Sequence, residues 1–413
     1  MKKPSVAIIG GGASGMMAGI AAAAKGAEVT IYEKNDRIGK KILATGNGKC
    51  NFSNLVLDDT CYNGSGQNVV KSVLERFTPK DCMEFFRVRG MLIKDRNGYL
   101  YPASEQASTV LDLLRMQLSF LKIPVVTECE IISVQKTEKG GYLLTAVREG
   151  KKQEFKAQRV ILAAGSVAGI PAKKAGKGAC ELLKGMDLPV VPLVPALVQL
   201  RCKEEFMKSV AGVRLDGEVT LYIEGKEVCR ERGEVQLTDY GISGIPVFQL
   251  SRFAAYALLR KKNVQIHLNC LPGFSQGEYD AFCKGRSIQN KEQTAEEFFL
   301  GICNKKLLLL FMKLSGIKPT DRMMEVPEPK KQKMYDLLRN LILIPTATNP
   351  FEQAQVCAGG LDMKAVDENL QVKKYPGFYV VGELLDVDGR CGGYNLQWAF
   401  ASGNVAGNHA AKG

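Results

Sequence analysis

The chain has 413 residues, of which 46% are hydrophobic and 24% are charged, as is ordinary for a globular protein. No apolar stretch reaches the roughly 18 residues that a membrane-spanning helix needs, which excludes that class of protein. The twelve cysteines stand singly and there are two histidines, His267 and His409, so the sequence predicts neither a zinc site nor a disulfide framework, and it indicates a reducing cytoplasm. The formal charge of +13 comes from scattered basic doublets, which favours a solvated basic surface over nucleic-acid binding.

The first predicted element is a strand, Val6 to Ile9, which runs directly into glycines with the spacing G-x-G-x-x-G. Gly10 permits a tight turn, Gly12 lets the backbone approach a pyrophosphate, and Gly15 lets the following helix pack closely on the strand. A helix from Met16 to about Lys25 would then point its N-terminus at the phosphates. This order of elements predicts a site for an adenine dinucleotide.

The second predicted strand, residues 28–33, ends in Glu33, which follows Gly15 by 18 residues. A carboxylate at about this spacing binds the ribose hydroxyls of a dinucleotide and disfavours the 2′-phosphate of NADP. The fingerprint alone leaves NAD and FAD open, because both use the same cradle. The glycine-rich loop from Lys34 to about Asn54 follows directly and is typical of a backbone cradle for anions and a cofactor.

The middle of the chain alternates between helical and strand-like patterns. We expect helices over 69–90 and 105–121, strands over 125–134 and 142–147, and a buried strand from Arg159 that returns to the parallel sheet. Gly176-Lys177-Gly178 is predicted to begin another helix. From Leu188 onward the sequence is rich in proline and has stretches in which polar and apolar residues alternate, which indicates a separate β-rich segment. Residues 247–314 have the apolar spacing of helices.

The tail carries the second strong signal, a strand over 377–381 that runs into Gly382-Glu383. A loop follows, and then a helix rich in small residues for which Asn395 is the expected N-cap. The N-terminal cradle and this segment lie at opposite ends of the chain, and the sequence has no second G-x-G-x-x-G for a nicotinamide. A long cofactor bound by both chain ends favours FAD, with NAD(P)H as a transient electron donor.

Four stretches resemble the BaiN/YhiN-like flavoproteins, a family of NAD(P)/FAD-dependent oxidoreductases also called aminoacetone-oxidase-like. The stretches are the fingerprint 10–33, the segment KKILATGNGKCN at 40–51, LTDYGISG at 237–244, and Gly359-Gly360 together with GELLDVDGRCGGYNLQWA at 382–399. The resemblance implies an α/β fold in three parts. They are a Rossmann-like FAD-binding domain from both chain ends (1–188 and 355–413), an inserted β-barrel-like domain (189–250 and 318–354), and a nested helical domain (251–317).

The resemblance also implies where each part of FAD would bind. Gly10, Gly12, Ser14 and Gly15 would hold the pyrophosphate, with Glu33 and Lys34 at the adenosine ribose and a backbone group of Ile131 or Ile132 at the adenine. Phosphate or ring contacts would come from Lys41, Asn47 and Gly48. The ribitol and isoalloxazine would be lined by residues from three later segments: Ala164, Gly165, Gly382, Glu383, Asn395, Leu396 and Gln397.

The activity implied is that of an FAD-dependent oxidoreductase, with the flavin passing a hydride from NAD(P)H to a small organic substrate. A conjugated enone such as a 3-oxo-Δ4 bile-acid intermediate is favoured, and oxidation of an amine by oxygen and flavin-dependent RNA modification stay open. A protein acid would protonate the α-carbon of an enone. Tyr394 and Tyr240 are candidates from position, and Cys391, where many relatives have Thr, is a candidate redox thiol. Substrate identity, nicotinamide preference and oligomeric state are not fixed by the sequence.

Overall fold

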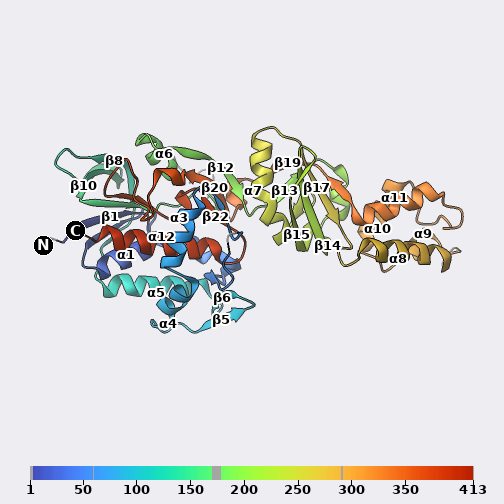
Figure 1. Ribbon diagram of the computed structural model, residues 1–413, viewed down its shortest axis with the longest axis horizontal. Helices are drawn as coiled ribbons and strands as arrows, with labels where there is room; N and C mark the ends of the chain where they lie inside the picture. Colours follow the sequence, from blue (N-terminus) through green and yellow to red (C-terminus); the bar gives the residue numbers. More distant parts are fainter. Residues whose placement is uncertain (1–2, 59, 170–177, 290–291, 413) are drawn as a thin grey trace. The chain divides into compact units, whose positions relative to one another are not determined.

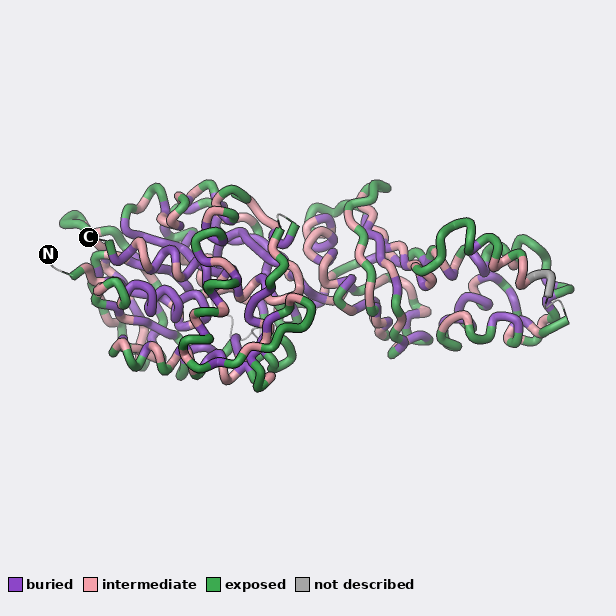
Figure 2. Tube along the Cα trace, turned by 60° about the horizontal axis from the view of Figure 1, so that its bottom comes forward, coloured by how far each residue is buried: buried purple, intermediate pink, exposed green. Residues whose placement is uncertain are grey.

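The computed structural model describes residues 3–58, 60–169, 178–289 and 292–412. It divides into two compact units, which we call the discontinuous unit (Met1–Val194 with Gln355–Gly413) and the inserted unit (Pro195–Ala354). Each unit has its own hydrophobic core, and Figure 2 shows the buried residues concentrated inside each. Among the described residues, no helix is long and apolar enough to cross a membrane.

A five-stranded parallel sheet forms the centre of the discontinuous unit, in the order β21-β11-β1-β2-β7. β1 (Ser5–Ile9) and β2 (Glu28–Tyr32) come from the N-terminal fingerprint, β7 is Val125–Val126, β11 is Arg159–Leu162 and β21 is Phe378–Val380. All four pairings are parallel, and Val160 lies opposite Ala7 on one side and Phe378 on the other. The prediction of a parallel sheet built from both chain ends is therefore confirmed.

Two helices from opposite ends of the chain pack side by side against this sheet (Figure 1). α1 (Ala13–Ala24) follows the glycine cradle, and α12 (Tyr394–Ala410) closes the chain. Gly403 and Gly407 of α12 permit the close approach, because a Cβ at these positions would lie 2.3 Å from the Ser14 carbonyl oxygen and 2.4 Å from that of Ala18. Contacts this short leave no room for any side chain.

The helix predicted over 69–90 is two helices, α3 (Gln67–Arg76) and α4 (Pro79–Arg87). Thr78 is extended and caps α4, accepting a hydrogen bond from the Asp81 amide while the Asp81 side chain accepts one from the Thr78 amide. Pro79 takes the first helical position, where its missing N–H costs nothing. This reciprocal cap, which the periodicity conceals, separates the two helices.

Smaller elements complete the discontinuous unit. A three-stranded antiparallel sheet combines β8 (Cys129–Lys136), β9 (Tyr142–Arg148) and β10 (Lys151–Ala157). The remaining strands are β3 (Ser53–Asn54), β4 (Tyr62–Gly64), β5 (Ile93–Arg96), β6 (Tyr99–Pro102), β12 (Val190–Ala196), β20 (Val356–Leu361) and β22 (Val387–Gly389). The remaining helices are α2 (Lys40–Leu43), α5 (Ala107–Phe120), α6 (Gly178–Gly185), η1 (Thr45–Gly48), η5 (Met363–Ala365) and η6 (Gly382–Leu384). The predicted beginning of α6 at Gly176 and Lys177 lies outside the described residues.

The inserted unit is organised around a seven-stranded antiparallel sheet in the order β18-β17-β14-β15-β16-β13-β19. Its strands are β13 (Leu200–Cys202), β14 (Arg214–Ile223), β15 (Lys226–Leu237), β16 (Gly241–Ser243), β17 (Val264–Asn269), β18 (Leu341–Leu343) and β19 (Pro345–Thr348). Its helices are α7 (Ile245–Leu259), α8 (Gln276–Gln289), α9 (Ala295–Phe299), α10 (Lys305–Ser315), α11 (Glu328–Arg339), η3 (Glu205–Val210) and η4 (Phe351–Gln353).

The segment 251–317, predicted to be helical throughout, contains β17, a strand at the centre of a ladder with β14 and β18. Val264, Ile266 and Leu268 are buried on alternate positions, which is the period of a strand with one face covered. The segment also begins within α7, which packs on the sheet, and it stops short of α11. The helical elements of the inserted unit therefore do not coincide with the predicted boundaries.

Candidate cofactor site

The glycine cradle lies between the end of β1 and the start of α1. Gly10 has φ +105°, and a Cβ there would lie 2.5 Å from the carbonyl oxygen of Ala163, at the end of β11. A Cβ at Gly15 would lie 2.0 Å from the Gly10 carbonyl oxygen. Gly12 differs, because its Cβ position meets no described atom within 4 Å. Two glycines are thus required by protein packing, whereas the third borders open space that a ligand can enter.

The N-terminus of α1 faces this space without a side-chain cap. Gly12 is the N-cap residue and makes no side-chain hydrogen bond. The first intrahelical bond runs from the Met16 amide to the Gly12 carbonyl oxygen at 2.9 Å, so the amides of Ala13, Ser14 and Gly15 have no helical partner. These amides and the helix dipole favour an anion such as a pyrophosphate.

Glu33 lies at the end of β2 and is 7% exposed. One carboxylate oxygen accepts the Gly11 amide at 2.7 Å, and the other accepts the amide of Asn35 at 2.9 Å. The predicted ribose-binding acid therefore also fixes the cradle, because its side chain holds the middle glycine of the turn. A carboxylate has about four acceptor positions, so these bonds leave capacity for a hydroxyl. Lys34, the next residue, is exposed.

The β8 strand begins beside Glu33, whose carbonyl oxygen accepts the amide of Cys129 at 2.9 Å. The β8–β9 ladder shifts register between Ile131 and Ser133, which leaves Ile132 as a bulge. A bulged residue keeps its backbone groups out of the ladder. Ile131 is buried and Ile132 is exposed, so of the two predicted adenine contacts, Ile132 is the one at the irregularity in the ladder.

Gly382, in the tail, is held against the N-terminal cradle. It has φ +70°, and a Cβ there would lie 2.6 Å from the Ser14 hydroxyl oxygen. Its amide donates to Ser402 Oγ at 3.0 Å, and its carbonyl oxygen accepts from Trp398 Nε1 at 3.1 Å. Ser402 and Trp398 are not among the residues that the sequence patterns predicted for the site. Their four-residue spacing, which places them on one face of α12, is the signal that was available.

Lys41 and Glu383 form an ion pair at 2.6 Å, which joins two predicted site segments that lie far apart in the sequence. The other oxygen of Glu383 accepts the Cys357 amide at 2.9 Å. The pKa of the Cys357 thiol is raised to about 12, and burial is the main cause. A hydrogen bond with Ser166 acts in the opposite direction and lowers this pKa. Ser166 follows Ala164 and Gly165, and Gly165 has φ +67° with no described atom within 4 Å of its Cβ position. Three predicted site segments therefore meet around Glu383.

The N-terminus of α12 differs from the prediction. Its N-cap is Gly393, with φ +91°, and not Asn395. The Asn395 side chain instead accepts the Gly389 amide at 2.8 Å and donates to the Gly389 carbonyl oxygen at 2.9 Å, which fixes the preceding loop. Gln397 is fully buried, accepting from Ser53 Oγ and donating to the Phe77 carbonyl oxygen. Any contact of these two residues with a cofactor would therefore use their backbone, because their side chains are engaged. Leu396, between them, is half-buried.

The loop that carries Asn47 and Gly48 has unusual backbone geometry and is exposed at both residues. Asn47 has φ 53° and Gly48 has φ 84°. A little further on, Asn51 Oδ1 is a buried acceptor without a hydrogen-bond partner among the described residues. A Cβ at Gly393 would lie 2.7 Å from that oxygen. The orphaned acceptor thus adjoins the N-terminus of α12.

The three catalytic candidates come from both units. Tyr394 is buried, and burial together with the Cys61 thiol raises its pKa well above the usual range, so it holds its proton firmly. Cys391 is half-buried in the same unit. Tyr240 belongs to the inserted unit, where its hydroxyl accepts from Asn349 Nδ2 at 3.1 Å.

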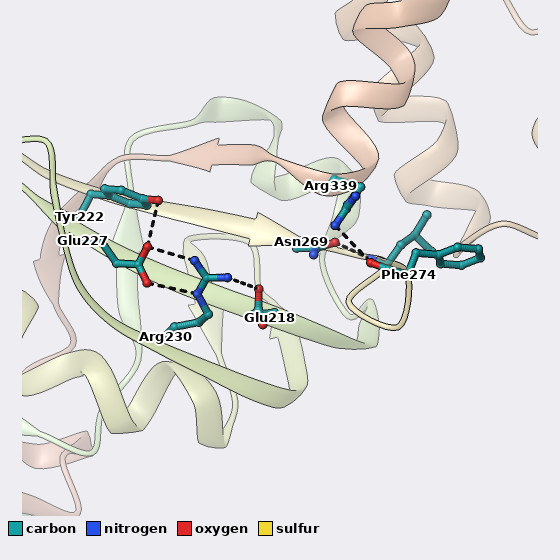
Figure 3. A network of polar contacts seen from close by, with 8 residues as sticks. Glu218, Tyr222, Glu227, Arg230, Asn269, Phe274 and Arg339 are labelled. Atoms are coloured by element: carbon teal, nitrogen blue, oxygen red, sulfur yellow. Dashed lines mark hydrogen bonds and ion pairs between the residues drawn. The ribbon is translucent and has the colours of Figure 1, made fainter. Parts of the chain in front are cut away.

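The inserted unit contains a cavity of about 890 Å³ between its sheet and the helices α8 and α11. Figure 3 shows part of its polar wall, where Arg230 contacts Glu218 and Glu227 and where Arg339 donates to the Phe274 carbonyl oxygen. Of the charged side chains that line it, Arg230 forms an ion pair with Glu218 at 3.3 Å and Glu328 forms one with Lys331 at 3.4 Å. No sequence motif predicted the residues that line this cavity.

Residues 4–409 match the family described as HI0933-like protein Rossmann domain. The chain belongs to this family. It is 39% identical over 410 residues to the 3-dehydro-bile acid delta(4,6)-reductase of Clostridium scindens, covering 98% of this chain and 99% of that protein. It is 25% identical over 399 residues to the ribosomal RNA dihydrouridine synthase of Haemophilus influenzae, covering 96% and 95%. As an HI0933-like protein, it is a flavin-dependent oxidoreductase.

Among solved structures, the 3-ketosteroid delta1-dehydrogenase of Sterolibacterium denitrificans shares the fold, with a TM-score of 0.53 at 13% identity over 99% of both chains. Membership in the HI0933-like family implies FAD as the cofactor. The residues present fit that group. The open space beside Gly12, the uncapped N-terminus of α1 and the Glu33 carboxylate match a pyrophosphate and a ribose.

Proposed function

We propose that this protein is an FAD-dependent reductase of conjugated enones, with NAD(P)H as the electron donor and a 3-oxo-Δ4 bile-acid intermediate as a representative substrate. The observation that carries the proposal is the 39% identity, over nearly the whole of both chains, to a 3-dehydro-bile acid delta(4,6)-reductase. We further propose a small-molecule substrate, no nucleic-acid partner and a cytoplasmic location.

When bound, FAD supplies a flavin ring that can accept a hydride from one molecule and deliver it to another. The chain's own part begins with binding. The free amides at the N-terminus of α1 would hold the pyrophosphate, and Glu33 would hold the ribose while it keeps Gly11 in place. Glu383 is positioned by Lys41 and by the Cys357 amide, so its carboxylate is fixed beside Gly382. These contacts orient the site before any substrate enters.

The test is an anaerobic assay of flavin reduction and reoxidation in the holoprotein. NADH or NADPH should bleach the flavin absorbance, and 4-androstene-3,17-dione, a steroid enone, should restore it in stoichiometric amount. The saturated 3-oxo steroid is the control and should not reoxidise the flavin. Flavin that is reduced by small amines and reoxidised only by oxygen, which is reduced to peroxide, would replace the proposal with amine oxidation.

A second candidate is a flavin-dependent modification of RNA. It is favoured by the 25% and 26% identities to ribosomal RNA dihydrouridine synthases of Haemophilus influenzae and Escherichia coli, and by the formal charge of +13. Such an enzyme would bind RNA with an affinity that falls steeply as salt increases. Filter binding of ribosomal RNA fragments at two salt concentrations decides this, since retention that is absent at low salt removes the candidate.

We propose in addition that the seven-stranded sheet closes into a barrel and that the helical elements form a third part. The strand order of the seven-stranded sheet begins with β18 and ends with β19, yet a single residue, Ile344, separates these two strands in the sequence. The Ile344 carbonyl oxygen accepts the Lys203 amide at 2.9 Å, and its amide donates to Glu204 Oε1 at 3.0 Å. One continuous segment therefore provides both ends of the strand order, which supports closure.

A further inference from the structure

A buried asparagine in the inserted unit joins an arginine and a tyrosine that the flavin fingerprint does not involve. Asn349 follows β19 and is 1% exposed. Its Oδ1 accepts from Arg201 NH1 at 3.2 Å, and its Nδ2 donates to the Tyr240 hydroxyl oxygen at 3.1 Å. The Arg201 guanidinium carbon lies 4.9 Å from the centre of the Tyr240 ring. One amide thus holds both side chains.

The sheet places these three residues together. β13 lies between β16 and β19, so Arg201 faces Gly241 on one side and Ala347 on the other. Tyr240 ends the turn before β16, and its carbonyl oxygen accepts the Cys202 amide at 2.8 Å. A Cβ at Gly241 would lie 2.0 Å from the Leu200 carbonyl oxygen, so only glycine allows this approach. The segment 237–244, one of the four stretches that carry the family resemblance, therefore positions the tyrosine.

The orientation of the amide follows from the arginine. A guanidinium has donors only, so the Asn349 atom that faces it is the oxygen and the atom that faces Tyr240 is the nitrogen. The tyrosine oxygen is consequently an acceptor in this contact, and its own hydrogen is free to be donated elsewhere. None of the described residues accepts that hydrogen. Asn349 Nδ2 also donates to Gln353 Oε1 at 2.6 Å, and Gln199 Oε1 lies within hydrogen-bond distance of it at 3.4 Å.

Arg201 also retains unused donors. It is exposed, and it forms no ion pair with any carboxylate in the part of the chain that the structure describes. Its contact with Asn349 uses one of five N–H groups. A fixed, un-neutralised guanidinium next to a hydroxyl with a free hydrogen is a pair of donors suited to a carbonyl oxygen or a carboxylate.

We propose that Tyr240 and Arg201 bind an acceptor oxygen of the substrate, and that Asn349 is the positioning residue that holds both donors. The inference rests on the proposed function, because it takes the substrate to be an oxo-steroid. Two oxygens of such a molecule have the required chemistry, the enone carbonyl and a side-chain carboxylate. A hydroxyl and a guanidinium recognise either one by the same hydrogen bonds.

The experiment measures ligand binding to the full-length holoprotein by calorimetry, without turnover. The ligands are 4-androstene-3,17-dione, which has no carboxylate, and 3-oxo-4-cholenoate, which has one. The variants are Tyr240→Phe and Arg201→Gln. Their matched controls are Tyr222→Phe, whose hydroxyl donates to Glu227 at 3.4 Å, and Arg214→Gln, whose guanidinium pairs with Glu234 at 3.1 Å.

We expect Tyr240→Phe to weaken binding about 3- to 10-fold and Arg201→Gln to weaken it about 10-fold or more, while the controls stay at the wild-type Kd. If the variants bind both ligands more weakly, the oxygen that Tyr240 and Arg201 recognise is the enone carbonyl. If they bind only the cholenoate more weakly, it is the carboxylate. A lower melting temperature with unchanged Kd values for both ligands would show a merely structural cluster and overturn the inference alone. Wild-type protein that binds neither steroid would overturn the proposed substrate class and the inference together.

Discussion

The contact between α1 and α12 makes a quantitative prediction about two glycines. In Gly403→Ala the new methyl group would lie 2.3 Å from the Ser14 carbonyl oxygen, and in Gly407→Ala it would lie 2.4 Å from that of Ala18. Both neighbours are helix backbone, so no side chain can rotate away and the helices must separate. Overpacking costs about 1–3 kcal/mol, and rigid backbone oxygens at 2.3 and 2.4 Å place these two variants in the upper part of that range, at about 2–3 kcal/mol. The better helix propensity of alanine offsets roughly 1 kcal/mol of this.

We therefore expect each variant to lower the free energy of unfolding by about 1–2 kcal/mol in urea denaturation. One outward shift of α12 relieves both contacts, so the double variant should cost clearly less than the two singles together. Gly285→Ala is the matched control, because this glycine lies within α8 and no described atom comes within 4 Å of its Cβ position. That change should be neutral or stabilising by about 0.5–1 kcal/mol.

FAD binding is the second readout, because Ser14 lies in the first turn of α1 and its displacement would move the amides of the cradle. The Kd for FAD of the apoprotein should rise in Gly403→Ala and stay at the wild-type value in Gly285→Ala. Unchanged stability in both α12 variants, or a strictly additive double variant, would refute the argument that a single close helix contact shapes the cradle.

Three further predictions concern individual side chains. Glu33→Ala should leave the buried Gly11 amide without its acceptor and cost about 1–3 kcal/mol in urea unfolding, together with weaker FAD binding; equal stability would contradict the clamp described for Glu33. Lys41→Ala should change stability by less than about 1 kcal/mol, because the lysine is 43% exposed and the pair is screened, and a larger loss in denaturant titrations would show that the pair is not a surface one. Burial raises the pKa of the Cys50 thiol from its ordinary value of 9.0 to about 11, so between these two pH values the native state keeps a proton that the unfolded state releases. The free energy of unfolding should therefore fall as the pH rises from 9 to 11, by at most about 1.4 kcal/mol per pH unit for this thiol. Urea unfolding of Cys50→Ala over the same pH range should show a smaller slope.

The parts of the fold that the sequence predicts are those in which local spacing decides the structure. Gly10, Gly12, Gly15 and Glu33 form one continuous strand–turn–helix–strand segment, and the structure places them as expected. The parallel sheet could be predicted because its strands are short, continuous apolar runs, as is typical of strands that are buried on both faces. In these segments each residue's role depends on neighbours a few positions away, which a pattern can detect.

The errors have equally local physical causes. Residues 69–90 keep a helical period across Thr78, and only the reciprocal cap with Asp81 interrupts the helix. β17 was read as helix because a six-residue strand lies between helical patterns in a segment with similar apolar content. Asn395 was assigned as an N-cap from its residue type, whereas Gly393 reaches the left-handed conformation that begins α12.

The contacts that shape the site are the ones that no single segment specifies. Gly382 is fixed by Ser402 and Trp398 of α12, and the space above it is limited by Ser14 of α1. The glycine spacing at the N-terminus therefore defines a turn, but the position of that turn relative to Gly382 depends on how closely α12 approaches α1. Because Gly403 and Gly407 set that approach, the last helix of the chain carries part of the information that makes the first turn a cofactor site.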